Sequence, residues 1–400
     1  MKRLRSLVAG PVRALDHAIG RRLGRRQVVF DARLPVHFVV VRPVLELLRR
    51  DPRVEVWVCS AEGRTDTIAA FDEAGFADRL LTREGCAWRR FDLYINGDPW
   101  CVAPLRRCSG WINFFHGVAG KYGLDQPPAD AHLFDRYDRV AFVNEDRLRR
   151  YLDAGIVTPT QAALVGYPKL DRLATGAFDA AAIRRSLGIP PDRPTVMYAP
   201  TWSSASSLHV AGEAIIGTLL ESGCNVIAKL HDNCFVRGER CAGDVDWRGR
   251  LARFASLSGF HLARSADSTA YMAASDILLT DHSSIGFEAL AIDQPVVVFD
   301  APDLVRVARI NPEKVALLRS AADIVTAADQ LPRVLEAVLR HPGARAEARR
   351  RVASQIFHAP GGATERALRL LYSALELSPD QRAIELATPV SRLPTVAVGS

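Results

Sequence analysis

Two histidines stand where a parallel sheet would place catalytic groups. His116 follows the apolar segment 111–115 and precedes Gly117, and His231 follows the segment 225–230. Histidine can act as a general base near neutral pH, because its ordinary pKa lies close to that range. A single histidine is more often structural, but two at strand ends in separate domains would face each other across a cleft. We therefore take both as candidate catalytic residues.

The segment 280–290 has the pattern of a nucleotide-binding turn. It reads Thr280-Asp281-His282-Ser283-Ser284-Ile285-Gly286-Phe287-Glu288-Ala289-Leu290. A buried strand would end at Thr280, and a helix capped by Ser283 or Ser284 would offer its N–H groups and positive dipole end to a phosphate. Glu288, in the first turns, could accept hydrogen bonds from a ribose. On this segment alone, a serine that only caps the helix and a solvated glutamate are the safer interpretation.

Strand and helix patterns alternate in two series. Strands are expected at 27–30, 54–58, 91–95, 111–115 and 139–143, with helices at 36–50, 65–74 and 146–154; Pro43 should kink the first helix or mark its start. A second series has strands at 195–198, 225–230, 276–280 and 295–299, with helices at 212–222, 267–274 and 283–291. Such interleaving predicts α/β domains with parallel sheets covered on both faces. Ligands bind beyond the carboxyl ends of such strands, which also brings Thr201 and Asp281 into the candidate site.

The two series predict a GT-B architecture, in which two Rossmann-like domains face an interdomain cleft. The expected divisions are a basic arm at 1–26, an acceptor domain at 27–175, a donor-nucleotide domain at 176–345, a helical segment at 346–376, and a tail without structure at 377–400.

The charge of the chain is concentrated at its beginning. Residues 1–26 hold eight Lys or Arg and one Asp, which accounts for the whole formal net charge of +7. Leu4, Leu7, Val8, Val12, Leu15 and Ile19 recur there at helical spacing. This pattern predicts an amphipathic segment on an anionic membrane surface, with a solvated helix or an unfolded leader as the alternatives. A neutral body excludes nucleic acid as the expected partner.

The apolar runs and the cysteines indicate the cellular compartment of the protein and the kind of site it can hold. No apolar run reaches the ~18 residues that a membrane-spanning helix needs, and the first residues do not form a secretory signal. The seven cysteines are scattered without a Cys-x2-Cys pair, which suits a reducing cytosol and argues against a zinc ribbon. We therefore expect a peripheral protein at the cytoplasmic face of the cell membrane.

Five motifs in order resemble the CDP-glycerol glycerophosphotransferase family, the teichoic acid primases and polymerases. They are Phe115-His116-Gly117, Gly166-Tyr167-Pro168-Lys169-Leu170-Asp171, Tyr198-Ala199-Pro200-Thr201-Trp202, Lys229-Leu230-His231 and Thr280 to Glu288, and Gly362 to Ala367 resembles the end of that family's conserved region. Three positions depart from the family pattern: Phe115 replaces Trp, Asp232 replaces Pro, and His282 replaces Tyr. The histidines and serines are retained.

The resemblance implies transfer of glycerol phosphate from CDP-glycerol to a hydroxyl of a lipid-linked glycan or polyol-phosphate acceptor, releasing CMP. It assigns His116 as base, His231 as a stabilising donor, and Thr201, Lys229, Thr280, Asp281, Ser283, Ser284 and Glu288 to the donor site. No metal ion and no cofactor are expected, because a helix start can replace a metal at the diphosphate.

Three other functions stay open. The chain could be a GT-B glycosyltransferase using a UDP- or CMP-sugar, since the three altered positions affect donor identity. It could be an isomerase like the UDP-N-acetylglucosamine 2-epimerases, which need no membrane tether. It could also be a nucleotide-binding partner without activity, although His116, His231 and Ser283 are intact.

Overall fold

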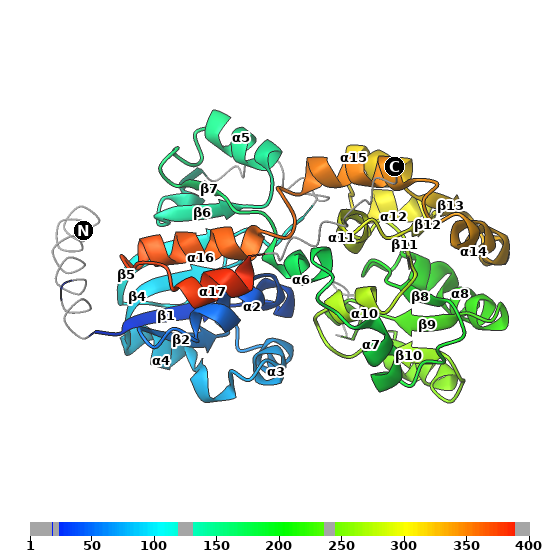
Figure 1. Cartoon of the computed structure of the whole chain (residues 1–400), viewed down its shortest axis with the longest axis horizontal. Coiled ribbons are helices and arrows are strands. Elements are labelled where there is room, and N and C mark those ends of the chain that lie inside the picture. Colours follow the sequence, from blue (N-terminus) through cyan, green and yellow to red (C-terminus); the bar gives the residue numbers. More distant parts are fainter. Residues whose placement is uncertain (1–17, 19–23, 119–130, 236–244, 389–400) are drawn as a thin grey trace, which may run out of the picture.

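The computed structural model describes residues 18, 24–118, 131–235 and 245–388. The expected arm at 1–26 lies almost wholly outside these residues, as does the end of the tail. Figure 1 shows two lobes side by side, each built on its own sheet. Every strand pair in both sheets is parallel. The GT-B-like, α/β prediction is confirmed.

The first lobe contains a seven-stranded sheet within the described residues. In spatial order its strands are β3 (Leu80–Leu81), β2 (Val54–Cys59), β1 (Arg26–Asp31), β4 (Arg90–Asn96), β5 (Arg107–Phe114), β6 (Arg139–Phe142) and β7 (Ala162–Leu164). Its helices are α2 (Pro35–Leu48), α3 (Thr65–Glu73), α4 (Arg83–Trp88) and α5 (Glu145–Asp153). The central strands are apolar and buried because helices cover both faces of the sheet. Pro43 lies inside α2, which begins earlier, at Pro35.

The second lobe contains a six-stranded sheet among the described residues. In spatial order its strands are β10 (Phe260–Leu262), β9 (Asn225–Ala228), β8 (Thr195–Tyr198), β11 (Ile277–Thr280), β12 (Val296–Phe299) and β13 (Asp323–Val325). Its helices are α7 (Ala180–Ser186), α8 (Ser207–Glu221), α9 (Trp247–Leu251), α10 (Thr269–Ala273), α11 (Ile285–Ala291), α12 (Pro302–Val307), α13 (Pro312–Ser320), α14 (Leu331–Arg340) and α15 (Ala346–Ile356).

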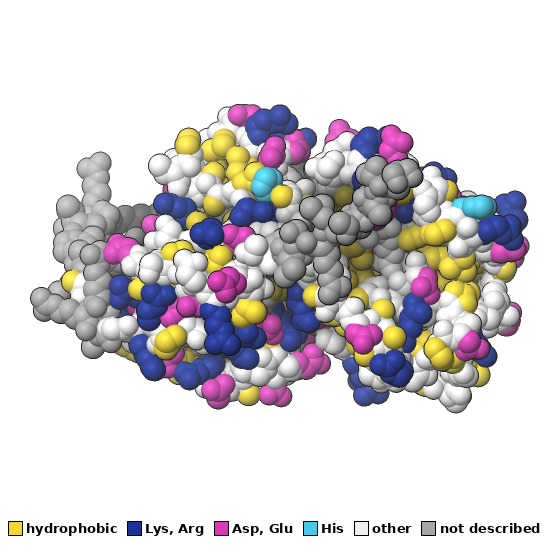
Figure 2. Space-filling model, in the orientation of Figure 1, with side chains coloured by type: hydrophobic (Ala, Val, Ile, Leu, Met, Phe, Trp, Pro, Cys, Tyr) yellow, Lys and Arg dark blue, Asp and Glu magenta, His cyan; other side chains and the backbone are white. Residues whose placement is uncertain are grey.

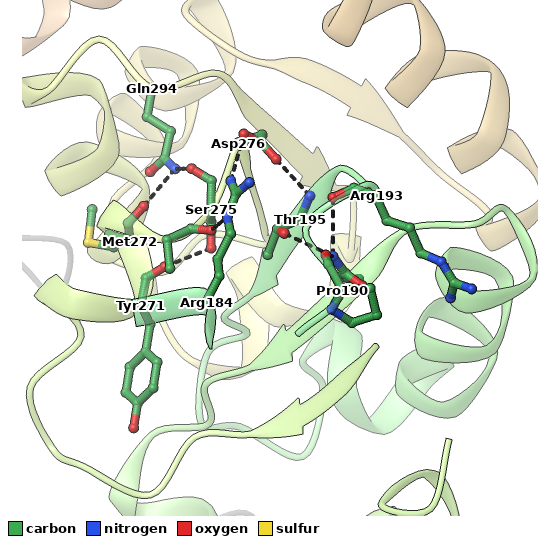
Figure 3. Close-up of polar contacts among 11 residues, drawn as sticks. Arg184, Pro190, Arg193, Thr195, Tyr271, Met272, Ser275, Asp276 and Gln294 are labelled. Atoms are coloured by element: carbon green, nitrogen blue, oxygen red, sulfur yellow. Dashed lines mark hydrogen bonds and ion pairs between the residues drawn. The ribbon is translucent and has the colours of Figure 1, made fainter. Parts of the chain in front are cut away.

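A polar network ties the beginning of the second sheet together (Figure 3). The Asn225 amide donates to the carbonyl oxygens of Pro190 and Arg193 and to Thr195 Oγ1, at 2.8, 3.1 and 3.2 Å. Asp276 accepts from the Thr195 backbone N–H at 2.7 Å and from Arg184. These bonds join the amino ends of β8, β9 and β11.

The chain crosses between the lobes twice, and the two crossovers are bonded to each other. The first holds α6 (Asp171–Ala174), and the second runs from α15 to α16 (Ala363–Ala374). Asp171 accepts from the backbone N–H groups of Gly361 and Thr364. Arg366 donates to the carbonyl oxygen of Val165 at 2.8 Å. The motifs at 166–171 and 362–367 therefore meet where the two crossovers lie side by side.

Gly166 shows why the first crossover needs a glycine. Its φ is +91°, and a Cβ there would lie 2.7 Å from the carbonyl oxygen of His358 in the second crossover. Any other residue would face both backbone strain and a clash.

After the second crossover the chain returns to the first lobe. Helices α16 and α17 (Gln381–Ala387) pack against α2 (Figure 1), and the Tyr372 hydroxyl donates to Asp51 at 3.1 Å. The tail was expected to lack structure from 377 onward, and the helix at 381–387 differs from that. Asp380 caps this helix by accepting from the Ala383 N–H, and Ala383, Ile384 and Ala387 are buried.

Candidate functional site

The candidate residues lie where the carboxyl ends of the two sheets meet the first crossover. His116 follows β5 in the first lobe, and Thr201, His231 and Asp281 follow β8, β9 and β11 in the second. Between the lobes, the first crossover contributes Tyr167 and Lys169, which the sequence analysis did not assign to the site.

His116 has the geometry of a general base. Its Nδ1 lies 2.6 Å from the carbonyl oxygen of Gly97, so Nδ1–H donates and Nε2 keeps its lone pair. Burial lowers the pKa of His116, while the Gly97 carbonyl and Asp98 act in the opposite direction. The ring is therefore neutral near pH 7 and able to take a proton. Arg147 fixes the turn by donating to the carbonyl oxygen of Gly117 at 2.7 Å.

Glu288 is a buried ion-pair partner, which rules out the solvated interpretation. Lys169 Nζ lies 2.6 Å from Glu288 Oε2, and each side chain is only 6% exposed. The Tyr167 hydroxyl donates to the backbone carbonyl oxygen of His116 at 3.4 Å. Burial, together with the charge of Glu288, raises the pKa of Tyr167 well above its ordinary value. Tyr167 therefore contacts the backbone of His116 and lies within the electrostatic reach of Glu288.

Lys229 adds a second buried cation. Its Nζ donates to the carbonyl oxygen of Leu230 at 2.9 Å. Burial lowers the pKa of Lys229, and the positive charge of Lys169 lowers it further, while Asp232 opposes this. His231 follows two residues later, and its Nδ1 accepts from the Asn233 N–H at 3.1 Å. With Nδ1 used as an acceptor, a neutral His231 carries its proton on Nε2.

Both carboxylate oxygens of Asp281 accept hydrogen bonds from within the protein. One oxygen accepts from the backbone N–H and hydroxyl of Thr201, at 2.9 and 2.6 Å. The other accepts from the N–H and hydroxyl of Ser207, at 3.1 and 3.0 Å, where it compensates the start of α8. Thr280 likewise donates to the carbonyl oxygen of Ala199 at 2.7 Å. These three side chains shape the turns, although the sequence analysis placed them at the donor.

Ser283 and Ser284 remain half-buried at the start of α11. Ser284 occupies the N-cap position, but its side chain makes no capping bond, which differs from the expectation. Among the described residues, neither hydroxyl has a hydrogen-bond partner. The helix has only seven residues, so its dipole is a smaller aid to anion binding than expected, and the hydroxyls become the more important donors.

A cavity of about 490 Å³ opens between the lobes beside this site. Its lining includes Arg64 from the start of α3, Asp232 after His231, and Arg248, Ala263 and Arg264 from the second lobe. That volume lies within the range of small-molecule sites. No sequence pattern indicated these arginines, because they come from three separate segments.

The described residues contain no group of three or more His, Cys, Asp or Glu side chains placed to hold a metal ion. No helix in the described part is long and apolar enough to cross a membrane.

Similar structures share this fold at low sequence identity. The wall teichoic acid polymerase TagF matches with a TM-score of 0.62 and 14% identity, covering 94% of this chain and 96% of that chain. The S. aureus protein MnaA, in its UDP co-structure, gives 0.56 and 11%, covering 89% and 98%. The UDP-GlcNAc 2-epimerase of Neisseria meningitidis, bound to UDP-GlcNAc, gives 0.54 and 14%, covering 88% and 99%.

Sequence comparison is more specific than the fold. No curated protein matched the chain. The family model of CDP-glycerol:poly(glycerophosphate) glycerophosphotransferase matches residues 105–373, a span that includes every residue of the candidate site from His116 to Glu288. On this match the chain belongs to the CDP-glycerol:poly(glycerophosphate) glycerophosphotransferase family, and it is a transferase of that family.

Proposed function

We propose that the protein transfers glycerol phosphate from CDP-glycerol to a hydroxyl of a lipid-linked glycan or polyol-phosphate acceptor and releases CMP. The observation that carries the proposal is His116, whose Nδ1 bonds to the Gly97 carbonyl and leaves Nε2 unprotonated. The buried Lys169–Glu288 pair supports it, because Glu288 is the carboxylate that we propose for the donor.

In the proposed reaction, His116 Nε2 takes the proton of the acceptor hydroxyl. The acceptor oxygen attacks the β-phosphorus of CDP-glycerol, a new P–O bond forms, and the bond to the CMP oxygen breaks. Negative charge grows on the transferred phosphoryl oxygens and on the departing CMP. Lys229, His231 and the hydroxyls of Ser283 and Ser284 would stabilise that charge, because fixed donors in a water-poor site need little reorganisation.

Glu288 would hold the ribose of the donor through a carboxylate oxygen. Its pairing with Lys169 orients the carboxylate and offsets the loss of its hydration. Thr201, Thr280 and Asp281 would act indirectly, by fixing the turns from which the direct contacts project. In the cavity lining, Arg64, Arg248 and Arg264 outnumber Asp66 and Asp232, which leaves a small excess of positive charge for a substrate that carries phosphate. Arg64 is paired with Asp66 at 2.6 Å.

The acceptor is proposed to be lipid-linked, with the arm 1–26 holding the protein at the cytoplasmic face of the membrane. The charge count supports this, because the body after residue 26 has 44 basic and 44 acidic residues. Figure 2 shows Lys and Arg intermingled with Asp and Glu over one face of the molecule. A mixed surface of this kind also argues against nucleic acid as the partner.

A donor panel tests the proposal. The full chain is incubated with CDP-glycerol, CDP-ribitol, UDP-N-acetylglucosamine and CMP-sialic acid, each with a polyglycerol-phosphate acceptor, and nucleotide release is followed. We expect CMP from CDP-glycerol. UDP release, or CMP release from the sugar nucleotide alone, would establish a glycosyltransferase. Conversion of the UDP-sugar without nucleotide release would establish an isomerase, and no reaction with any donor would favour a partner without activity.

A further inference from the structure

The ring of His37 packs against the ring of His116, and His37 lies outside every motif identified in the sequence. It stands in the first turn of α2 and is 1% exposed. The ring centroids of the two histidines are 4.1 Å apart, and the rings are tilted by 34°. Within the described part of the chain, neither nitrogen of His37 has a hydrogen-bond partner. His37 therefore contacts His116 by ring packing and not through a hydrogen bond of its nitrogens.

Gly97 connects the same two histidines through the backbone. A Cβ at Gly97 would lie 2.9 Å from Cβ of His37 and 3.1 Å from its Cγ. The backbone of Gly97 thus packs directly on His37, and the carbonyl oxygen of Gly97 accepts the Nδ1–H of His116. His37 touches both the ring of the base and the residue that fixes the proton position on that ring.

This packing has a consequence for the state of His116. A buried ring against one face of His116 keeps water away from that face and prevents rotation of the imidazole. Water at this position would solvate the charged imidazolium and offer Nδ1 an alternative partner. Either effect would reduce the fraction of His116 that carries an unprotonated Nε2.

We propose that His37 is a positioning residue for the transfer reaction, which holds His116 in its Nδ1–H tautomer through ring stacking and close packing on Gly97. The proposal rests on the proposed role of His116 as the base. His37 is not itself a proton acceptor, because burial and the nearby His116 and Arg33 lower its pKa well below the ordinary value. The other charged groups that act on His116 are Asp98, Arg147 and Arg33.

The kinetic test compares His37→Ala with His37→Phe in the full chain. His37→Ala should lower kcat by about 10²-fold, as expected for a reacting group that loses its orientation, and should leave the KM for CDP-glycerol within about twofold. The acidic limb of its pH–rate profile should move up toward the ordinary histidine pKa. His37→Phe keeps the stack and should restore most of the rate. Val40→Ala, on the same helix and equally buried, controls for lost core packing and should not move the limb.

A structural readout keeps the test independent of activity. Nitrogen NMR of protein labelled at histidine reports which ring nitrogen of His116 carries the proton, with His116→Gln identifying the signal. The wild type and His37→Phe should show Nδ1–H, whereas His37→Ala and Gly97→Ala should show a mixture of tautomers. An unchanged His116 signal in His37→Ala would overturn the proposal. If instead His116 proves dispensable for turnover, the base assignment fails while the NMR result still decides the positioning role.

Discussion

Lys169 and Glu288 form a buried ion pair that joins the first crossover to α11, with 2.6 Å between Nζ and Oε2. Glu288 is the carboxylate expected to hold the donor ribose, and Lys169 belongs to the segment around which the lobes connect. If Glu288 binds the donor as proposed, donor recognition and the geometry of the crossover share one contact. The pair is then expected to have both a stability role and a binding role, which separate experiments can distinguish.

The stability role predicts strong coupling between the two side chains. Lys169→Met or Glu288→Leu alone leaves a buried charge without its partner and should destabilise the protein by about 3–5 kcal/mol. The double variant removes both charges and should be much less destabilised. Chemical denaturation of the two single variants and the double variant measures the coupling. The exposed pair Glu336–Arg340 is the control, with an expected effect of about 0–1 kcal/mol. Additive losses at Lys169 and Glu288 would contradict a direct interaction.

The binding role predicts weaker donor affinity. Glu288→Ala and Ser284→Ala each remove a side chain that we propose to bond to the nucleotide, and each should weaken CDP binding by about 1–3 kcal/mol. Isothermal titration calorimetry measures the change, and Ser354→Ala on the outer helix α15 is a matched control. CDP affinity that is unchanged in both variants would place the nucleotide elsewhere.

The base assignment predicts a loss of turnover without a loss of binding. His116→Ala should lower kcat by about 10²–10⁴-fold, the usual contribution of a general base. CDP affinity and the melting temperature should stay close to those of the wild type, since the donor contacts come from the second lobe. Turnover near the wild-type rate would remove His116 from the mechanism.

The pH dependence of the rate follows from the pKa of His116. Burial lowers this pKa below its ordinary value of 6.5, and a base must be unprotonated to act. The acidic limb of kcat/KM should therefore fall below pH 6.5. The same shift makes the stability of the protein depend on pH. As pH falls, His116 binds its proton in the unfolded chain before it does so in the folded chain. The contribution of His116 to the free energy of unfolding is therefore complete above pH 6.5 and declines as pH drops through the folded pKa. A limb midpoint above pH 7 would show a different titrating group.

The sequence predicted the lobes well because their strands are long or strongly apolar. Strand β11 is buried throughout and β4 is buried after its first residue, so their apolar composition identifies them. The edge strands β3, β7, β10 and β13 have two or three residues and show no usable pattern. The helix α17 was missed because prolines surround a short segment whose apolar residues face α2, a contact formed only after the second crossover returns the chain.

The site was predicted less completely, for a related reason. Strand ends are visible in a sequence, and they identified His116, His231 and the serines. The function of Asp281 was not visible, because its four donors come from Thr201 and Ser207, more than 70 residues away. Lys169 lay within a quoted motif, but its partner is 119 residues away. His37 had no signal at all, since its stacking depends on the three-dimensional placement of α2 against β5.

Membrane attachment through residues 1–26 gives the last prediction. Each cation near an anionic surface contributes up to ~1 kcal/mol, and the apolar stripe from Leu4 to Ile19 adds burial among the lipids. Deleting 1–26 should release the protein from anionic liposomes, yet leave activity on an acceptor analogue without a lipid. Salt should weaken the binding of the full chain only in part, because screening reduces the charge contribution and leaves the apolar one.

On a lipid-linked acceptor the deletion should lower the rate, since confinement at the surface raises the effective acceptor concentration. A variant in which Lys2, Arg3, Arg5 and Arg13 become Ser controls for the charge alone and should bind with intermediate affinity. If the deleted chain co-sediments as well as the full one, the arm is not the anchor, and the attachment must be sought on the folded lobes.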